Sequence, residues 1–174
     1  MSRFITFVIT ILIVAFTVAS GLKLSREQIL RPFVDGKAFK VISGLHNFDK
    51  EIVSNVAWAA NEGGASHIDI ACCPDLVKTT KDITNVPVCV SSIKPSDFLK
   101  AVDAGADMVE IGNFDGFYEQ GLKFTADDVV NMTRETRKLL PFIPLSVTIP
   151  HTLALHEQVN FPMSIEIILS EYYI

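Results

Sequence analysis

The chain lacks the residues and motifs on which several functional classes depend. Its three cysteines in 174 residues are too few for a disulfide framework, and we interpret the adjacent Cys72 and Cys73 as small core residues. The net charge is −5 and no Lys/Arg run is present, which argues against nucleic acid as the main partner. The motifs of P-loops, nucleophile elbows, zinc proteases and dinucleotide loops are also absent, so these sites are not expected.

Long apolar runs are missing as well, except at the N-terminus. Arg3 precedes about sixteen apolar residues that end in small ones near Ser20. At a rise of ~1.5 Å per residue this run spans about 24 Å, which is short of a bilayer core of ~30 Å. We therefore predict that residues 1–20 are a cleaved signal peptide, which leaves no stable membrane span. A membrane anchor is the alternative.

What is present, over a length that suggests one domain, is a regular alternation of strand and helix patterns. Short β-branched or apolar runs occur at 40–44, 66–71, 86–92, 107–113 and 143–150. Helical patterns lie between them at 47–65, 75–83, 94–106 and 125–140, and a shorter helix capped by Ser25 precedes them all. This order indicates βα units on a parallel sheet, which is typical of both a Rossmann-type sheet and a (βα)₈ barrel.

An internal repeat favours the barrel. The stretch "GASHIDIA" (64–71) resembles "GADMVEIG" (105–112), and it matches Asp69 with Glu110 about forty residues later. That interval is two βα units, and alternate strands of a (βα)₈ barrel supply the side chains of one interior layer. We therefore predict an α/β fold of the (βα)₈ TIM-barrel type with about five βα units. Asp69 and Glu110 would point inward near its C-terminal mouth.

These two carboxylates are the strongest candidates for chemistry. Burying an unpaired carboxylate costs several kcal/mol, so Glu110 needs a bound cation, a substrate group or a protein donor as its partner. The pair would act as general acid and base or bind a hard cation such as Mg²⁺, and structural hydrogen bonds are the alternative. His151 or His46 would shuttle protons. We predict Asp69, Glu110 and His151 as catalytic residues and assign no metal.

Further polar residues follow the strands and are expected at the same mouth. The candidate substrate-binding residues are His46, Asn47, Ser91, Ser92, Asn113, Asp115 and Thr148. The loop 114–124 carries glycines and aromatics that suit a lid. Lys40 begins the first strand, at the opposite end, so a Schiff-base lysine is not expected. His67 begins the second strand and is expected to be structural.

The chain resembles a known family at six stretches in the right order: "KVISGLHNFD", "DIACCPDLV", "VCVSSIKPSDF", "AGADMVEIGNFDGFYEQG", "TRETRKLLP" and "LSVTIPHTL". This is the hypothetical chloroplast reading frame twenty-three family of algal plastids and cyanobacteria, and the resemblance runs from about Leu24 to about Val159. It implies a TIM barrel of unknown biochemical function in a plastid setting. It supplies no catalytic residues to carry over.

Both ends of the chain depart from that family. The extra residues 1–20 imply import into a plastid through the secretory route, with a secreted or membrane-anchored protein as the alternative. After Val159 the sequence lacks the helix and strand that should follow the fifth strand. We therefore expect a signal peptide at 1–20, a partial barrel at 21–159 and a divergent tail at 160–174. Open sheet edges would invite aggregation, or two half-barrels would pair as a homo-oligomer.

The sequence thus predicts a protein that binds a small metabolite, phosphorylated ones included, at the mouth of a barrel. The alternative is a non-catalytic regulatory or assembly protein of the plastid, with the aromatic loop 114–124 as its partner surface. The reaction, any cofactor and the enzymatic nature of the chain are left open.

Overall fold

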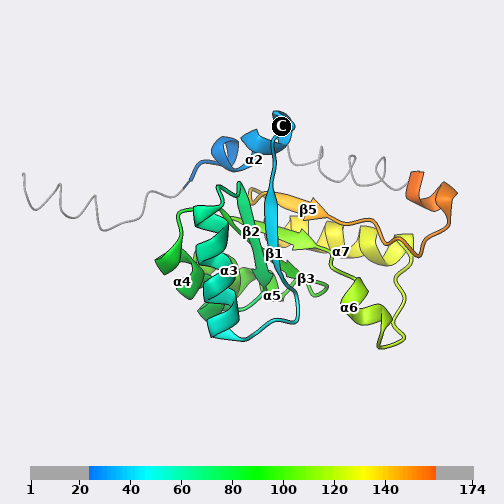
Figure 1. Ribbon diagram of the computed structural model, residues 1–174. Coiled ribbons are helices and arrows are strands. Elements are labelled where there is room, and N and C mark those ends of the chain that lie inside the picture. The colour runs from blue at the N-terminus through cyan, green and yellow to red at the C-terminus, as the bar shows by residue number, and fades with distance from the viewer. Residues whose placement is uncertain (1–23, 160–174) are drawn as a thin grey trace, which may run out of the picture.

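The computed structural model describes residues 24–159, so the predicted signal peptide at 1–20 and tail at 160–174 lie outside the described residues. Five strands form one sheet in the order β1-β2-β3-β4-β5 (Figure 1). Every neighbouring pair is parallel. The strands are Lys40–Gly44, His67–Ala71, Val88–Ser92, Met108–Ile111 and Leu145–Val147. Because the order never reverses, as it does in a Rossmann sheet, the topology is that of barrel units.

The helices are α2 (Arg26–Val34), α3 (Lys50–Glu62), α4 (Pro74–Ile83), α5 (Asp97–Asp103), α6 (Asp115–Tyr118) and α7 (Ala126–Leu139). Their starts follow capping signals in the sequence. Ser25 and Gln28 form a capping box at α2, and Thr125 and Asp128 form another at α7. The predicted helix 94–106 is shortened to α5, and α6 was not predicted as a helix.

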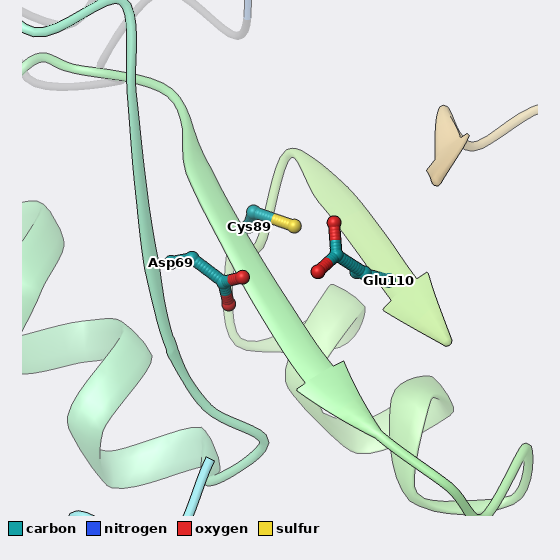
Figure 2. Close-up of side chains that lie close together, drawn as sticks. All are labelled: Asp69, Cys89 and Glu110. Atoms are coloured by element: carbon teal, nitrogen blue, oxygen red, sulfur yellow. The ribbon is translucent and has the colours of Figure 1, made fainter. Parts of the chain in front are cut away.

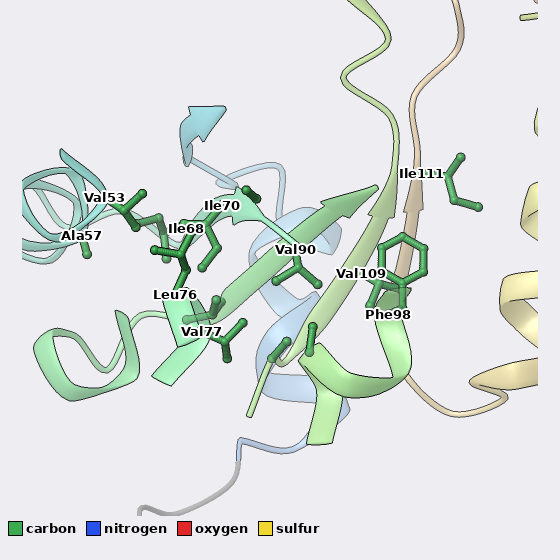
Figure 3. Packing of buried hydrophobic residues seen from close by; sticks show 14 of the residues in the cluster. Val53, Ala57, Ile68, Ile70, Leu76, Val77, Val90, Phe98, Val109 and Ile111 are labelled. Atoms are coloured by element: carbon green, nitrogen blue, oxygen red, sulfur yellow. The ribbon is translucent and has the colours of Figure 1, made fainter. Parts of the chain in front are cut away.

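The main hydrophobic core lies between the sheet and the helices on its outer face, as Figure 3 shows. Side chains alternate along a strand. Val109 and Ile111 of β4 therefore face the helices, and Glu110 faces the inner side. The same alternation in β2 directs Asp69 inward. On the helix side the core is built from α3, α4, α5 and α7, with Val53, Leu76, Phe98 and Val129 among its buried members.

Helix α2 covers the end of the sheet where the strands begin (Figure 1). Its Ile29 packs against Cys89 and Met108 on the inner face. His67 Nε2 donates to the Ile29 carbonyl oxygen at 2.8 Å. Burial lowers the pKa of His67, so the ring stays neutral in this contact. His67 thus has the structural position that the sequence predicted.

The two outermost strands of the described sheet, β1 and β5, have one free edge each. Ile42 of β1 is 51% exposed, which agrees with an open edge. A helix begins at residues 155–159. The expected absence of a helix and a strand after Val159 lies outside the described residues. In the described range 24–159, no helix is both long and apolar enough to cross a bilayer.

The core makes a direct prediction about stability. Phe98 is fully buried in α5, and its chain neighbour Leu99 is 39% exposed. Phe98→Ala should lower the free energy of unfolding by about 3–5 kcal/mol because it leaves a cavity. Leu99→Ala is the matched control and should cost much less. Urea unfolding measures both, and equal losses would contradict this packing.

Candidate functional site

A group of three charged side chains, two buried carboxylates and one partly buried lysine, occupies the inner face of the sheet. The Lys40 ammonium contacts both the Asp69 and the Glu110 carboxylates, and its Nζ lies 3.2 Å from Asp69 Oδ2. Asp69 is 1% exposed and Glu110 is 4% exposed. Figure 2 shows the carboxylates of Asp69 on β2 and Glu110 on β4 on either side of the Cys89 thiol, which comes from β3 between them. The structure therefore brings together the two acids that the repeat had paired.

Lys40 corrects the sequence analysis. Its Cα lies at the beginning of β1, paired with His67, as predicted. Its side chain nevertheless extends over the inner face as far as Glu110 on β4. Its position at the start of β1 was expected to keep Lys40 away from the site. That expectation was wrong, because the four-carbon side chain of Lys40 reaches Asp69 and Glu110. Among the three partners considered for Glu110, the structure contains a protein donor.

The environment changes the protonation of these groups. Burial raises the pKa of Asp69 to about 6, and the nearby Glu110 adds to the rise, against the opposing effects of Lys40 and Ser91. Burial alone would lower the pKa of Lys40, but the surrounding acidic groups outweigh it and raise that pKa. Lys40 is therefore an ammonium at neutral pH, and a protonated amine cannot attack a carbonyl to form a Schiff base.

Two hydroxyl groups bind the carboxylates. Ser91 Oγ donates to Asp69 at 2.7 Å from Oδ1 and 2.9 Å from Oδ2. Thr148 Oγ1 donates to Glu110 Oε1 at 3.4 Å. Thr148 can approach because residue 112 is glycine; a Cβ there would lie 2.8 Å from Thr148 Cβ. Each acid thus has a hydroxyl donor in addition to the ammonium.

Asn113 extends this network toward the strand ends. Its Nδ2 donates to Ser91 Oγ at 3.1 Å. Its φ of 58° lies in the left-handed region, which asparagine tolerates better than most residues. Asn113 follows β4 directly, so the network runs from the inner face to the mouth.

Two pockets open at the end where the strands finish. One has a volume of 210 Å³ and is lined by Leu45, His46, Phe48, Cys72, Ser91, Ser92, Ile93, Lys94, Asp97 and Phe117. The other has a volume of 300 Å³ and is lined by Gly44, Leu45, His46, Asn47, Asn113, Asp115 and Gly116. Six of the seven predicted binding residues are therefore in these linings, and the seventh, Thr148, contacts Glu110.

His46 and His151 both contact the short helix α6. The His46 ring meets Phe117 of α6 edge-on, with 4.8 Å between ring centroids. The His151 ring meets Tyr118 in the same way at 5.0 Å, and its Nδ1 lies 3.2 Å from Asp115 Oδ1. Helix α6 thus contacts His46 after β1 and His151 after β5. The contacts described for His151 are with α6, and its catalytic role stays a prediction.

Among the described residues, Asp69, Cys89 and Glu110 could also hold a metal ion, since their ligand atoms lie within 4.8 Å of one another. The Lys40 ammonium already supplies the positive charge at the two carboxylates. Burial raises the pKa of the Cys89 thiol well above its ordinary value, which disfavours the thiolate that a metal needs. The two carboxylates therefore have a cationic partner in the Lys40 ammonium.

Lys40 and Cys89 are members of this group that were not predicted from the sequence. Period-two alternation could have found Lys40, because Lys40 and Ile42 share one face of β1 and Ile42 is level with Asp69. Cys72, by contrast, fits the prediction of a core residue: burial raises the pKa of its thiol to about 12. Such a thiol is a poor nucleophile at neutral pH.

The ion group predicts a stability loss that depends on pH. The folded-state pKa of Asp69 lies above its unfolded value of ~3.9. Protonated Asp69 therefore stabilises the fold at low pH, and this contribution is lost as pH rises through about 6. Lys40→Met should lower the free energy of unfolding by about 3–5 kcal/mol at about pH 8, where both carboxylates are left buried and unpaired.

At about pH 5 the same variant should lose less, because Asp69 without Lys40 becomes protonated and needs no counter-ion. Urea unfolding at the two pH values measures the difference. Lys78→Met removes an exposed lysine and serves as the control, with little change at either pH. A loss for Lys40→Met that is the same at both pH values would overturn the assigned protonation.

Comparison with known proteins places the chain in a family. A family model described as a protein of unknown function (DUF561) matches residues 24–172. The uncharacterized protein ycf23 of Cyanophora paradoxa is 50% identical over 131 residues, which cover 75% of this chain and 54% of the relative. Its counterpart in Antithamnion sp. is 39% identical over 145 residues, covering 83% and 52%. The chain thus spans about half the length of the curated relatives it matches.

Solved structures agree on the fold. QR15, an aldolase, matches with a TM-score of 0.54 and 19% identity, over 76% of this chain and 62% of that chain. A Coccidioides immitis protein assigned as a deoxyribose-phosphate aldolase matches with a TM-score of 0.53 and 17% identity, over 78% and 55%. At these identities the likeness shows the TIM-barrel fold alone. The chain belongs to the DUF561 family of unknown function, with ycf23 proteins as its relatives, and has an incomplete TIM-barrel architecture.

Proposed function

We propose that the chain catalyses proton transfer on a small carbonyl compound bound at the mouth of the barrel. The observation that carries this proposal is the buried group of Lys40, Asp69 and Glu110. Buried charges are costly, so a fold that needed only stability would gain little from two buried carboxylates with a lysine as their partner. Strongly shifted titratable groups beside a pocket are typical of functional sites.

The protonation of the acids supports this chemistry. A carboxyl group with a pKa of about 6 is ionised at neutral pH but still basic enough to accept a proton. Lys40 stays an ammonium and stabilises the negative charge of the pair. Removal of a proton beside a carbonyl group is the step that aldol reactions require. The aldolase names of the structural neighbours therefore support a carbonyl substrate, although their likeness extends to the fold alone.

The size and lining of the pockets support a small ligand. Their volumes of 210 and 300 Å³ lie at or below the lower end of the ~300–1,000 Å³ usual for drug-sized ligands. Lys94 lies in the lining of the smaller pocket and offers an ammonium to an anionic end of the substrate. A phosphorylated metabolite with a carbonyl group meets both conditions.

The compartment is part of the same proposal. The relatives carry the name ycf23, which denotes a plastid reading frame. We therefore propose that this chain acts in a plastid, on a metabolite of that compartment.

Proton exchange tests the proposal without knowledge of the full reaction. The 174-residue chain is mixed in D₂O with a panel of small carbonyl compounds, phosphorylated and unphosphorylated. Proton NMR then follows the replacement of hydrogen by deuterium beside the carbonyl. At least one compound should exchange faster than in buffer. Its rate should rise with pH through about 6, because the ionised form of Asp69 is the base.

Asp69→Asn should slow that exchange by about 10²–10⁴-fold, the usual contribution of a general base. Asp103→Asn makes the same chemical change at an exposed residue of α5 and should leave the rate unaltered. The proposal is wrong if no compound exchanges faster than in buffer, or if Asp69→Asn exchanges as fast as the unaltered chain.

A further inference from the structure

The buried acids do not themselves face the two pockets at the mouth. Asp69 and Glu110 are absent from the lining of both. Ser91 is also buried, but it lies in the lining of the 210 Å³ pocket and hydrogen-bonds to Asp69. It is therefore the group that joins a ligand in this pocket to the candidate base.

The hydrogen bonds fix the direction of the Ser91 hydroxyl proton. Asn113 Nδ2 can only donate, so Ser91 Oγ accepts at 3.1 Å. The Asp69 carboxylate can only accept, so the Ser91 O–H donates to it at 2.7 Å. A serine oxygen has two lone pairs, and Asn113 occupies one of them. The second lone pair remains for a proton that arrives from the pocket.

The corresponding hydroxyl at Glu110 is less suited to this role. Thr148 Oγ1 is 3.4 Å from Glu110 Oε1, which is a long contact for two oxygens. Thr148 is also absent from the linings of the two pockets at the mouth. The geometry thus favours the path through Ser91 and Asp69.

We propose that Ser91 is a catalytic residue that relays a proton between the carbonyl compound and Asp69, with Asn113 as its positioning residue. This inference rests on the proposed function. The C–H bond beside the carbonyl breaks and its proton bonds to Ser91 Oγ, while the Ser91 O–H proton passes to Asp69. The electron pair of the C–H bond stays on the substrate as an enolate, and Asp69 becomes neutral. The negative charge moves from the carboxylate to the substrate, and Ser91 is regenerated.

The exchange of hydrogen for deuterium in the same carbonyl compound tests the relay. Ser91→Ala should slow exchange by about 10²–10⁴-fold, as expected for loss of a proton-transfer group. Ser91→Thr keeps a hydroxyl and should restore most of the rate. The residual exchange of Ser91→Ala should also show its pH midpoint above about 6, because Asp69 loses a donor that lowers its pKa. A serine that only bonded Asp69 would move this midpoint as well, but its loss would not slow the exchange catalysed by ionised Asp69 by this factor.

Ser54→Ala is the matched control, because it removes an exposed hydroxyl that bonds only the Lys50 carbonyl oxygen among the contacts described. It should leave the rate and the midpoint unchanged. Urea unfolding checks that each variant is folded. If Ser91→Ala does not fold, Ser91→Cys replaces it: its weaker S–H donor should slow exchange while Ser91→Thr does not.

The outcomes separate the two proposals. If the unaltered chain exchanges no compound of the panel, the proposed function fails and the relay fails with it. If the chain exchanges a compound and Asp69→Asn slows it, but Ser91→Ala or Ser91→Cys matches the unaltered rate, the relay alone is wrong. Loss of rate in Ser91→Ala with rescue by Ser91→Thr supports both.

Discussion

On the inner face of the sheet, one lysine ammonium contacts two carboxylates that are almost completely removed from water. Two buried carboxylates this close repel each other, and each carries a desolvation cost of several kcal/mol. Lys40 offsets that repulsion, and the hydroxyls of Ser91 and Thr148 provide further donors. The arrangement requires three strands in a fixed order and register, because the lysine comes from β1 and the acids come from β2 and β4.

The two ends of the strands differ in character: packing contacts lie at their beginning and the pockets lie at their end. At their beginning, α2 packs Ile29 against Cys89 and Met108, and His67 donates to the backbone of α2. At their end are the pockets, Asn113 with its left-handed backbone, and the short helix α6. The ion group lies between these two regions. This division is usual in TIM barrels, in which the carboxyl ends of the strands carry function.

Much of this arrangement could be predicted from the sequence, because it depends on local periodicity. The repeat of Asp69 and Glu110 predicted which side chains converge, since strand alternation and strand order are regular. Lys40 was missed because sequence position locates a Cα, whereas a long side chain acts several ångströms away. The contacts of His151 with residues 115–118 were not predicted, because this short helix has no clear sequence signal. Contacts between loops depend on tertiary packing, and local sequence patterns do not predict them.

The most direct test of this account is the pKa of Asp69. Carbon-13 labelling of aspartate carboxyl groups in the 174-residue chain allows an NMR titration, and the spectrum of Asp69→Asn identifies the signal of Asp69. The account predicts a midpoint of about 6, because burial and Glu110 oppose ionisation more strongly than Lys40 and Ser91 favour it. A midpoint near the ordinary value of ~3.9 would mean that burial and Glu110 do not outweigh Lys40 and Ser91, and would contradict the assigned protonation of Asp69.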